Sequence, residues 1–519
     1  MRFAAAFLAA SLASNLAVGA TAQTVVNEVA ELVPPSLDEF DLFGRGIAIN
    51  ERVIAVGAPG DDQGAQDSGA FYLFDGQTYD YRTKVAAPVA ESTQDFGREI
   101  AVWDNAVYVA ARRKQDDLNR FRGAVNLNSD AGIGPFREFL PEPTTEPQAN
   151  DQFGASLAAG PEVLVVGAPL DSIGEINAGA VYIFRGLDAP LVLRPTDLPN
   201  SRLFGIDVAL DDDLLLVGAS GYRNPGETVG VGAAYLFDVN TGAQVAKIVS
   251  PIPASSLNSA FGRAVAIEGN RLVIGARDAS PAGTSFAGQS FSYIYDAPTQ
   301  TIVPENVLTA TPPIVTGRFG TSIATGETLT TITAPAHANG GEAFVYRHGD
   351  PSPIARYIPN DTDGLGDFGR NIATDGTRFA IGAPQSDGGG RAFGFRNPIR
   401  VLAEPRDFVA VNNDLIQILF GLEGVGPDVQ YRWRKDGRFI TDVTIFDGFD
   451  TEELLFIAGP NTAGVYDCVV TTPTQTIVSE PSIVAVRNDC PADQNFDGRL
   501  SPGDFNAWVL NYNLGCNPR

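Results

Sequence analysis

Six residues near the end of the 519-residue chain have the types and the spacing of calcium ligands. Counted from residue 493, oxygen-bearing side chains stand at positions 1, 3, 5, 9 and 12 of a loop, and a main-chain carbonyl oxygen is available at position 7. Gly498, at position 6, permits the sharp turn that such a loop needs. The segment therefore predicts one Ca²⁺ site, whose ligands are Asp493, Asn495, Asp497, the carbonyl oxygen of Arg499, Ser501 and Asp504.

The element that must position this loop is small. The amphipathic segment DFNAWVLNYN, residues 504–513, follows the loop and predicts a short helix. A turn-rich stretch can match part of such a loop by chance, but a match at every position followed by an amphipathic segment favours the calcium site. Cys490 and Cys516 flank the unit. We expect them to form a disulfide in an exported protein, because about 30 residues bury too little apolar surface to be stable alone.

The motif DxNxDGxLSPxDFxAW has Asp at position 12, where Glu is more usual, and it resembles a dockerin-type repeat. The resemblance implies a calcium-ordered module over residues 488–519 that attaches the chain to a scaffold or a surface. Dockerins carry two such loops, whereas this chain has one. Pairing with a cohesin is therefore not implied.

Residues typical of common active sites are scarce in the rest of the chain. It contains two histidines, His337 and His348, and it lacks the motifs GxSxG, HExxH and GxxxxGK. We expect the histidines to occupy loop or rim positions, and we expect no enzymatic activity. Carboxylates from separate parts of the fold could still converge, and sequence spacing does not reveal such a pair.

One sequence unit, exemplified by FGRGIAINERVIAVGAPGDDQGAQDSGAFYLFD at residues 43–75, occurs seven times. Each copy contains short β-branched runs separated by turns of Gly, Asp and Asn, which predict four strands. Four strands in a repeat of about 50 residues favour the blades of a β-propeller over an array of two-sheet sandwiches. The Phe-Gly pairs that begin the copies are at Phe43, Phe96, Phe153, Phe204, Phe261, Phe319 and Phe368.

Three local features of the unit have a physical interpretation. The glycine after each Phe permits a tight turn or a close approach to a neighbouring blade. The proline of Gly-Ala-Pro ends the second strand, because proline cannot donate to a strand ladder. The seventh copy lacks a fourth strand, and the segment NEVAELVPPS, residues 27–36, precedes the first copy. We expect this segment to complete the last blade and close the ring.

The Phe-Gly and Gly-Ala-Pro motifs resemble the FG-GAP repeats at the head of integrin α chains and in many bacterial surface proteins. The resemblance covers residues 24–397 and implies a seven-bladed propeller, assigned to residues 23–397. Calcium-binding members carry an Asp-rich loop between the first two strands of a blade, whereas the turns here are as short as NER, GPE and DDD. We expect little or no Ca²⁺ in the propeller. We also expect the acidic residues of later loops to be solvated turn residues, as at Asp61, Asp62, Asp361 and Asp363.

Residues 398–487 follow a different pattern. Trp433 stands after a predicted strand, and Tyr466 stands two residues before Cys468, behind GPNTAG. This arrangement resembles a bacterial immunoglobulin-like domain, with a tyrosine corner and a central tryptophan. The partner cysteine of that domain is missing, so we expect Cys468 to be a buried thiol that packs as a small apolar side chain.

The ends and the charge of the chain limit its location and partners. The first 22 residues form an Arg-led apolar stretch that ends in Ala20-Thr21-Ala22, which predicts a signal peptide cleaved after Ala22. No later run is long enough to span a membrane. The net charge is −26, from 36 Lys and Arg against 62 Asp and Glu, which disfavours binding to nucleic acid or anionic lipid. We expect a secreted or cell-surface protein with no membrane insertion.

Together these patterns predict an all-β fold: a seven-bladed β-propeller, an immunoglobulin-like β-sandwich and a short α-helical calcium-loop module. The function we predict is that of a non-enzymatic binding or adhesion protein with an extracellular protein or glycan ligand and Ca²⁺ in the C-terminal loop only. The alternative is an accessory or catalytic component of an extracellular polysaccharide-degrading assembly. Loops on a rigid scaffold are common recognition sites, and the longer candidates are residues 60–69, 113–123 and 220–232.

Overall fold

The structure is a computed structural model. It describes residues 24–487, apart from residues 64, 90, 116–120, 129–135, 142–149, 173–176, 187, 198–199, 254–258, 338–339, 399, 412, 424–428 and 473–475. The predicted signal peptide, Cys490, Cys516 and all six predicted calcium ligands lie outside the described residues. The chain divides into two compact units, and the first consists largely of residues up to 393.

The described part of the first unit is built from seven β-sheets, and in each of them four strands lie side by side. The first four sheets are β3 (Ile47–Ile49), β4 (Val53–Ala58), β5 (Ala70–Asp75), β6 (Tyr81–Ala86); β7 (Phe96–Trp103), β8 (Ala106–Ala111), β9 (Ala124–Asn128), β10 (Phe136–Phe139); β11 (Ser156–Gly160), β12 (Val163–Ala168), β13 (Ala180–Arg185), β14 (Leu191–Leu193); and β15 (Phe204–Asp211), β16 (Leu214–Ala219), β17 (Ala233–Asp238), β18 (Gln244–Val249).

The other three sheets continue this order. They are β19 (Phe261–Glu268), β20 (Arg271–Ala276), β21 (Gln289–Asp296), β22 (Thr301–Leu308); β23 (Ile323–Thr325), β24 (Leu329–Ala334), β25 (Glu342–Arg347), β26 (Pro353–Tyr357); and β27 (Ile372–Thr374), β28 (Arg378–Ala383), β29 (Arg391–Arg396) with β2 (Ala30–Glu31). A 3₁₀ turn, Pro281–Gly283, lies between β20 and β21.

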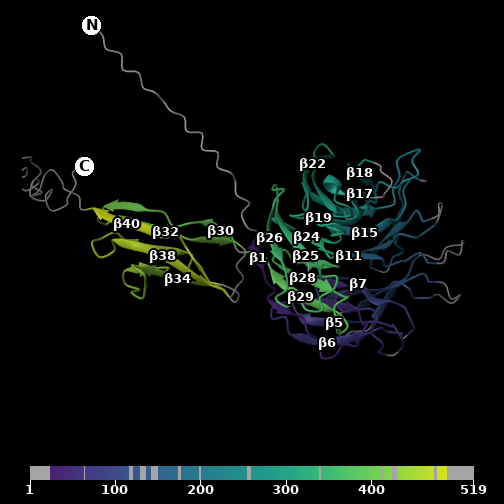
Figure 1. The fold of residues 1–519 in the computed structure, drawn as a ribbon, viewed down its shortest axis with the longest axis horizontal. Coiled ribbons are helices and arrows are strands. Elements are labelled where there is room, and N and C mark those ends of the chain that lie inside the picture. The colour runs from purple at the N-terminus through teal and green to yellow at the C-terminus, as the bar shows by residue number, and fades with distance from the viewer. Residues whose placement is uncertain are drawn as a thin grey trace, which may run out of the picture. The chain divides into compact units, whose positions relative to one another are not determined.

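The first strands of successive sheets pack against one another and close a ring. Strand β3 contacts β7, the contacts continue through β11, β15, β19 and β23 to β27, and β27 contacts β3. Figure 1 labels β7, β11, β15 and β19 within one body, with the colour advancing from purple to green. The described residues contain no α-helix, and the expectation of an all-β, propeller-like fold is confirmed.

Strands from the N-terminal segment complete the last sheets, as the segment before the first Phe-Gly pair predicted. Strand β2 lies beside β29, and the amide of Leu32 donates to the carbonyl of Ala392 at 2.9 Å. The guanidinium of Arg391 donates to both carboxylate oxygens of Glu31, at 2.7 and 3.1 Å. Strand β1 (Thr24–Val26) adds in parallel to β26 and makes the sixth sheet five-stranded (Figure 1). The first and last parts of the ring are thereby joined.

The repeated motif is a packing device between neighbouring sheets. All seven Phe side chains of the Phe-Gly pairs are fully buried, so they are core residues. In the pair of sheets that meet at β4 and β7, Gly97 has φ +93°, and a Cβ on Gly57 would lie 1.7 Å from the Gly97 carbonyl oxygen. Both interpretations of the glycine after Phe therefore apply: the turn is left-handed, and the neighbouring backbone approaches closely.

The described part of the second unit is a two-sheet sandwich. One sheet has the order β31 (Phe408–Val411), β40 (Ser482–Arg487), β38 (Gly464–Thr471), β34 (Gln430–Lys435), β35 (Arg438–Phe439), with β39 (Thr476–Val478) also beside β38. The other has β32 (Leu415–Leu419), β37 (Glu453–Ile457) and β36 (Phe446–Asp447), and β30 (Arg400–Ala403) pairs with β33 (Gly421–Glu423).

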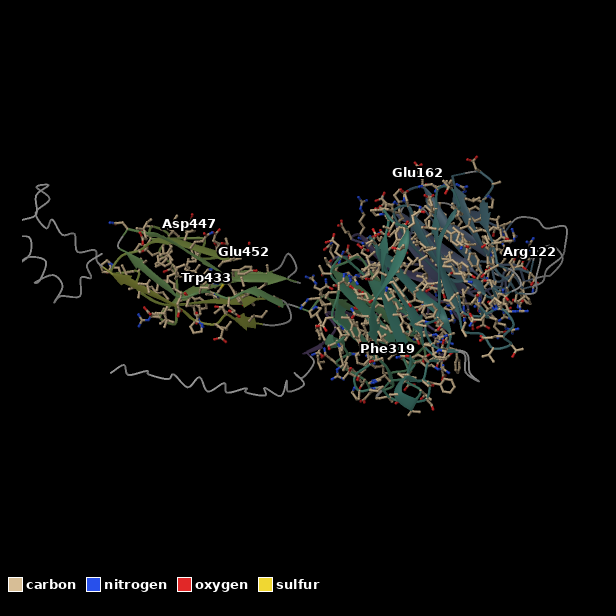
Figure 2. All side chains as sticks on the ribbon, turned by 90° about the horizontal axis from the view of Figure 1, so that it is seen from above. Arg122, Glu162, Phe319, Trp433, Asp447 and Glu452 are labelled. Atoms are coloured by element: carbon tan, nitrogen blue, oxygen red, sulfur yellow. The ribbon has the colours of Figure 1, made fainter. Side chains whose placement is uncertain are left out.

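Trp433 and Tyr466 lie in the core that both sheets of the sandwich share. Trp433 is labelled among the side chains of this unit in Figure 2, and its indole N–H donates to the carbonyl of Thr451 at 2.9 Å. The Tyr466 hydroxyl donates to the Thr462 carbonyl at 2.5 Å, four residues back in the chain. Cys468 is a free, fully buried thiol, as expected, and burial raises its pKa to about 12. It is therefore not poised for thiolate chemistry.

Candidate functional site

Two kinds of connection gather at one end of the ring. One kind joins the second strand of a sheet to the third, and the other joins the fourth strand to the next sheet. Main-chain hydrogen bonds link the two kinds, as from Gly60 to Asp41 at 3.0 Å and from Thr93 to Gln66 at 2.9 Å. We call this end the loop rim and define it by the described residues 36–42, 59–63, 65–69, 87–89, 91–95, 112–115, 121–123, 140–141, 150–153, 169–172, 177–179, 194–197, 200–203, 220–232, 250–253, 259–260, 277–288, 309–320, 335–337, 340–341, 358–368 and 384–390. The described residues of the three long candidate loops, 60–69, 113–123 and 220–232, all belong to it.

The loop over residues 220–232 is anchored at its base and exposed at its tip. Tyr222 and Val231 are buried in the core between the third and fourth sheets, and the Val231 amide donates to the Tyr222 carbonyl at 2.7 Å. The ammonium of Lys247 lies 3.7 Å from the centre of the Tyr222 ring. Residues 225–228, between these anchors, are exposed. Such a loop presents a defined tip from a fixed base.

The acidic loop at residues 60–69 corrects one expectation. Asp61 is buried, with 2% of its surface exposed, and is not a solvated turn residue. Its carboxylate accepts from the Tyr72 hydroxyl at 2.9 Å and pairs with the Lys84 ammonium at 2.6 Å. A buried carboxylate needs such partners. Asp62, in contrast, is exposed, and its side chain accepts from the Asp67 amide at 2.7 Å.

The arrangement of Asp61 recurs in other sheets. In the third sheet the buried Asp171 accepts from the Tyr182 hydroxyl at 2.8 Å. In the fourth sheet Asp197 accepts from the Tyr235 hydroxyl at 2.9 Å and pairs with Lys247. In each case the tyrosine is on the third strand of the sheet. These carboxylates therefore hold the loop bases in place, and Asp361 and Asp363 remain exposed, as predicted.

Exposed apolar side chains on the loop rim were not identified from the sequence. Phe40 is 74% exposed and has φ +78°, an uncommon conformation for a bulky residue. Val89, Leu140 and Val315 are also at least half exposed. All four lie in connections between sheets, where the sequence offers only a large apolar residue inside a turn-rich segment as a signal. The rim therefore carries single exposed apolar side chains as well as exposed acidic residues such as Asp62.

A second candidate site lies on the axis of the ring. A cavity of about 70 Å³ is lined by side chains from all seven sheets, and most of these residues stand one or two positions after a Phe-Gly pair. It combines four arginines with two carboxylates. The lining residues are Arg45, Glu99, Ala155, Ile206, Asp207, Arg263, Arg277, Thr321, Ser322, Arg370 and Asn371.

Burial perturbs the charged groups around this axial cavity. It raises the pKa of Glu99, and it raises the pKa of Asp207 to about 7, although the amides of Val265 and Val208 donate to that carboxylate at 2.8 and 3.1 Å. Burial also lowers the pKa of the Arg45 guanidinium to about 9. Two carboxylates from separate sheets thus do converge, a possibility that sequence spacing could not test.

The two histidines have structural partners. His337 is in a turn, but it is buried rather than exposed, and its Nδ1 lies 3.3 Å from a Glu342 carboxylate oxygen. His348 follows β25, and its Nε2 lies 3.3 Å from the Thr330 hydroxyl. Burial lowers the pKa of His348 to about 4, so its ring is neutral at pH 7. Neither histidine lines the axial cavity.

A metal ion bound within the described residues would need several ligating side chains close together. Within them, no three His, Cys, Asp or Glu side chains form a group that could hold a metal ion. In the turn between β3 and β4, the Asn50 side chain accepts from the amides of Arg52 and Val53, at 2.9 and 3.0 Å, and so organises the turn itself. The predicted calcium loop lies outside the described residues and stays a prediction.

Three segments of the ring match a known repeat. The matched residues are 26–74, 145–184 and 192–237, which fall in the first, third and fourth sheets. They match the FG-GAP repeat. This match and the closed ring of sheets support an FG-GAP, β-propeller-like protein of the ligand-binding or adhesion type. FG-GAP repeats are typical of extracellular proteins, and within the described residues no helix has the length and apolar character to cross a membrane.

Whole-protein comparisons add little to the FG-GAP match. No curated protein is significantly similar to the chain. Among solved structures, the first domain of Duf (Kirre) is 16% identical, with a TM-score of 0.16 over 18% of this chain and 98% of that one. The titin M10 and obscurin-like 1 immunoglobulin complex is 24% identical, with a TM-score of 0.16 over 18% and 95%. The twitchin kinase region from C. elegans is 11% identical, with a TM-score of 0.16 over 18% of each chain. Scores this low carry no argument.

Proposed function

We propose that this chain is a secreted or surface-associated, non-enzymatic binding or adhesion protein, and that the loop rim of its propeller holds the ligand. The observation that carries the proposal is the FG-GAP match on a ring whose long loops and exposed apolar side chains share one end. The apolar side chains Val89, Leu140 and Val315 favour a protein ligand over a glycan, because aliphatic groups at interfaces bind other apolar surfaces.

We further infer the identity of the modules. The seven sheets act as seven blades of an FG-GAP propeller. The second unit acts as an immunoglobulin-like spacer, an assignment supported by the buried Trp433 and by the hydrogen bond from Tyr466 to Thr462. Residues 488–519 act as a dockerin-like module that binds Ca²⁺ through Asp493, Asn495, Asp497, Arg499, Ser501 and Asp504 and anchors the protein.

The alternative, a catalytic component of a polysaccharide-degrading assembly, gains one relevant observation. Glu99 and Asp207 converge in the axial cavity, as paired carboxylates of a glycosidase would. A glycosidase needs room for a sugar ring between its two carboxyl groups. The cavity has a volume of about 70 Å³, and four arginines stand beside its two carboxylates. Binding is therefore the function that the described residues support better.

Affinity capture from the source organism's culture fluid and envelope tests the proposal. The bait is the mature chain, compared with the Phe40→Ala and Trp103→Ala variants. Trp103 is the matched control, because it is also an exposed aromatic residue, at 45% against 74%, but it ends β7 at the opposite end of the ring. We expect Phe40→Ala to reduce capture of a saturable partner at least about fivefold, the effect of losing roughly 1 kcal/mol at an interface. Equal capture by all three baits would contradict a rim site.

A separate set of capture experiments tests the anchoring role of the C-terminal module. The same capture is repeated with a calcium chelator and with residues 488–519 removed. If partners are lost both with the chelator and with the truncated chain, and the Phe40→Ala variant still captures them, they bind through the C-terminal module. Partners that persist under both conditions contradict the anchoring role and leave the propeller or the sandwich as the binding unit.

A further inference from the structure

The axial cavity has a charge opposite to that of the whole protein. Four arginines and two carboxylates line it, which leaves two positive charges, whereas the chain carries a net charge of −26. The arginines come from different parts of the sequence: Arg45, Arg263 and Arg370 follow Phe-Gly pairs in the first, fifth and seventh sheets, and Arg277 follows β20. Like charges gathered in a confined space repel one another, so this arrangement calls for a compensating group.

The guanidinium groups have few partners within the protein. Among the described residues, the side chains of Arg45, Arg263 and Arg370 make no hydrogen bond and no ion pair within 4 Å. Arg277 reaches the carboxylate of Asp278 only at 3.7 Å, and its Nε has no hydrogen-bond partner. A guanidinium carries five N–H donors in a planar fork. The cavity is therefore lined by guanidinium donors from the first, fifth and seventh sheets that have no partner among the described residues.

The two carboxylates do not compensate these donors. The oxygens of Asp207 accept from the main-chain amides of Val265 and Val208. Glu99 makes no hydrogen bond or ion pair within 4 Å in the described part of the chain. Its negative charge favours the charged form of Arg45, whereas the positive charges of Arg98, Arg112 and Arg370 disfavour it. The repulsion among the arginines is thus only partly offset.

We propose that the axial cavity binds one small tetrahedral oxyanion of the phosphate or sulfate class, held by Arg45, Arg263, Arg277 and Arg370. Arginine forks match the geometry of such an ion and donate in pairs. The hydroxyl of Ser322, also in the lining, accepts from the Ile372 amide at 3.3 Å and keeps its own proton as a neutral donor. A volume of about 70 Å³ suits a single small ion better than a peptide or an oligosaccharide. The ion would also link the sheets from the inside of the ring, a function that goes beyond ligand binding at the rim.

Calorimetric titration of the full mature chain with inorganic phosphate and with sulfate tests the proposal, in a buffer whose only other anion is a bulky sulfonate. We expect one saturable site and a rise of the melting temperature with ion concentration. Arg263→Gln and Arg370→Gln should each weaken binding about tenfold. Arg263→Lys should weaken it less, because the charge remains. Glu99→Gln should strengthen binding, because it removes the carboxylate that opposes the anion.

Arg52→Gln is the matched control, because it removes one positive charge from an exposed turn, away from the axis. It should bind the ion as the unmodified chain does. No saturable binding in the millimolar range, or equal binding by Arg263→Gln and Arg52→Gln, would overturn the proposal.

Glucose 6-phosphate serves as a further probe. Binding as tight as that of inorganic phosphate would overturn the assignment to a free ion, because a cavity of about 70 Å³ suits the ion without its sugar. Loss of binding in Arg263→Gln with capture at the rim intact separates the two proposals.

Discussion

His348 shows how a single half-buried side chain couples this fold to pH. Its ring is held neutral against the Thr325 and Thr330 hydroxyls, at 3.4 and 3.3 Å, and burial lowers its pKa to about 4. The unfolded chain has a histidine pKa near 6.5. Between these values the unfolded state binds the proton and the folded state does not. The contribution to stability is therefore complete above about pH 6.5 and is lost as the pH falls toward 4.

We predict that His348→Gln flattens this part of the stability profile. A glutamine side chain can still hydrogen-bond the two threonine hydroxyls, but it does not titrate. Each pKa unit corresponds to about 1.4 kcal/mol, and partial exposure reduces the effect. We expect the variant to lose about 1–2 kcal/mol less than the unmodified chain between pH 7 and pH 4. Urea unfolding at several pH values measures it, and parallel curves for the two proteins would contradict the prediction.

At the scale of elements, the contact between neighbouring sheets is specified by glycine. A Cβ on Gly97 would lie 2.3 Å from the Ala70 carbonyl oxygen, whereas Gly376 has nearly the same φ, +94° against +93°, and nothing within 4 Å of its Cβ position. Both changes to alanine cost about 1–2 kcal/mol in backbone strain. We expect Gly97→Ala to cost about 1–3 kcal/mol more, because the neighbouring main chain must shift. Thermal unfolding of both variants measures the difference, and equal losses would assign the whole effect to φ.

The sequence repeat made most of the strands predictable. It did not reveal which charged residues meet in the axial cavity. Each Phe-Gly pair, each Gly-Ala-Pro and the spare segment before the first copy have local physical reasons, so strands and ring closure could be derived from them. Arg45, Glu99, Asp207 and Arg263 stand in different copies, and their convergence depends on a closed ring. Aligning the residues after each Phe-Gly pair would have revealed this charged layer. The burial of Asp61 was missed because its partners, Tyr72 and Lys84, lie on later strands.

At the scale of the whole molecule, ring closure depends on two residues of β2. We predict that a mature chain lacking residues 24–33 exposes the edge of β29, melts at a markedly lower temperature and aggregates. A chain lacking only residues 24–28 is the matched control, because β1 is an outer fifth strand of a sheet that keeps four. It should behave nearly as the unmodified chain does. Calorimetry and size-exclusion chromatography compare the two, and similar behaviour of both deletions would show that β2 is dispensable.

The bond between Glu31 and Arg391 joins residues 360 positions apart. A ribosome that adds about 5–20 residues per second needs roughly 20–70 s to make the intervening chain. Strand β2, made near the start of synthesis, therefore waits for β29, the last strand of the ring. Until then the nascent protein is a growing arc of sheets with an open edge at each end, and only its completion turns that arc into a molecule without free sheet edges at its seam.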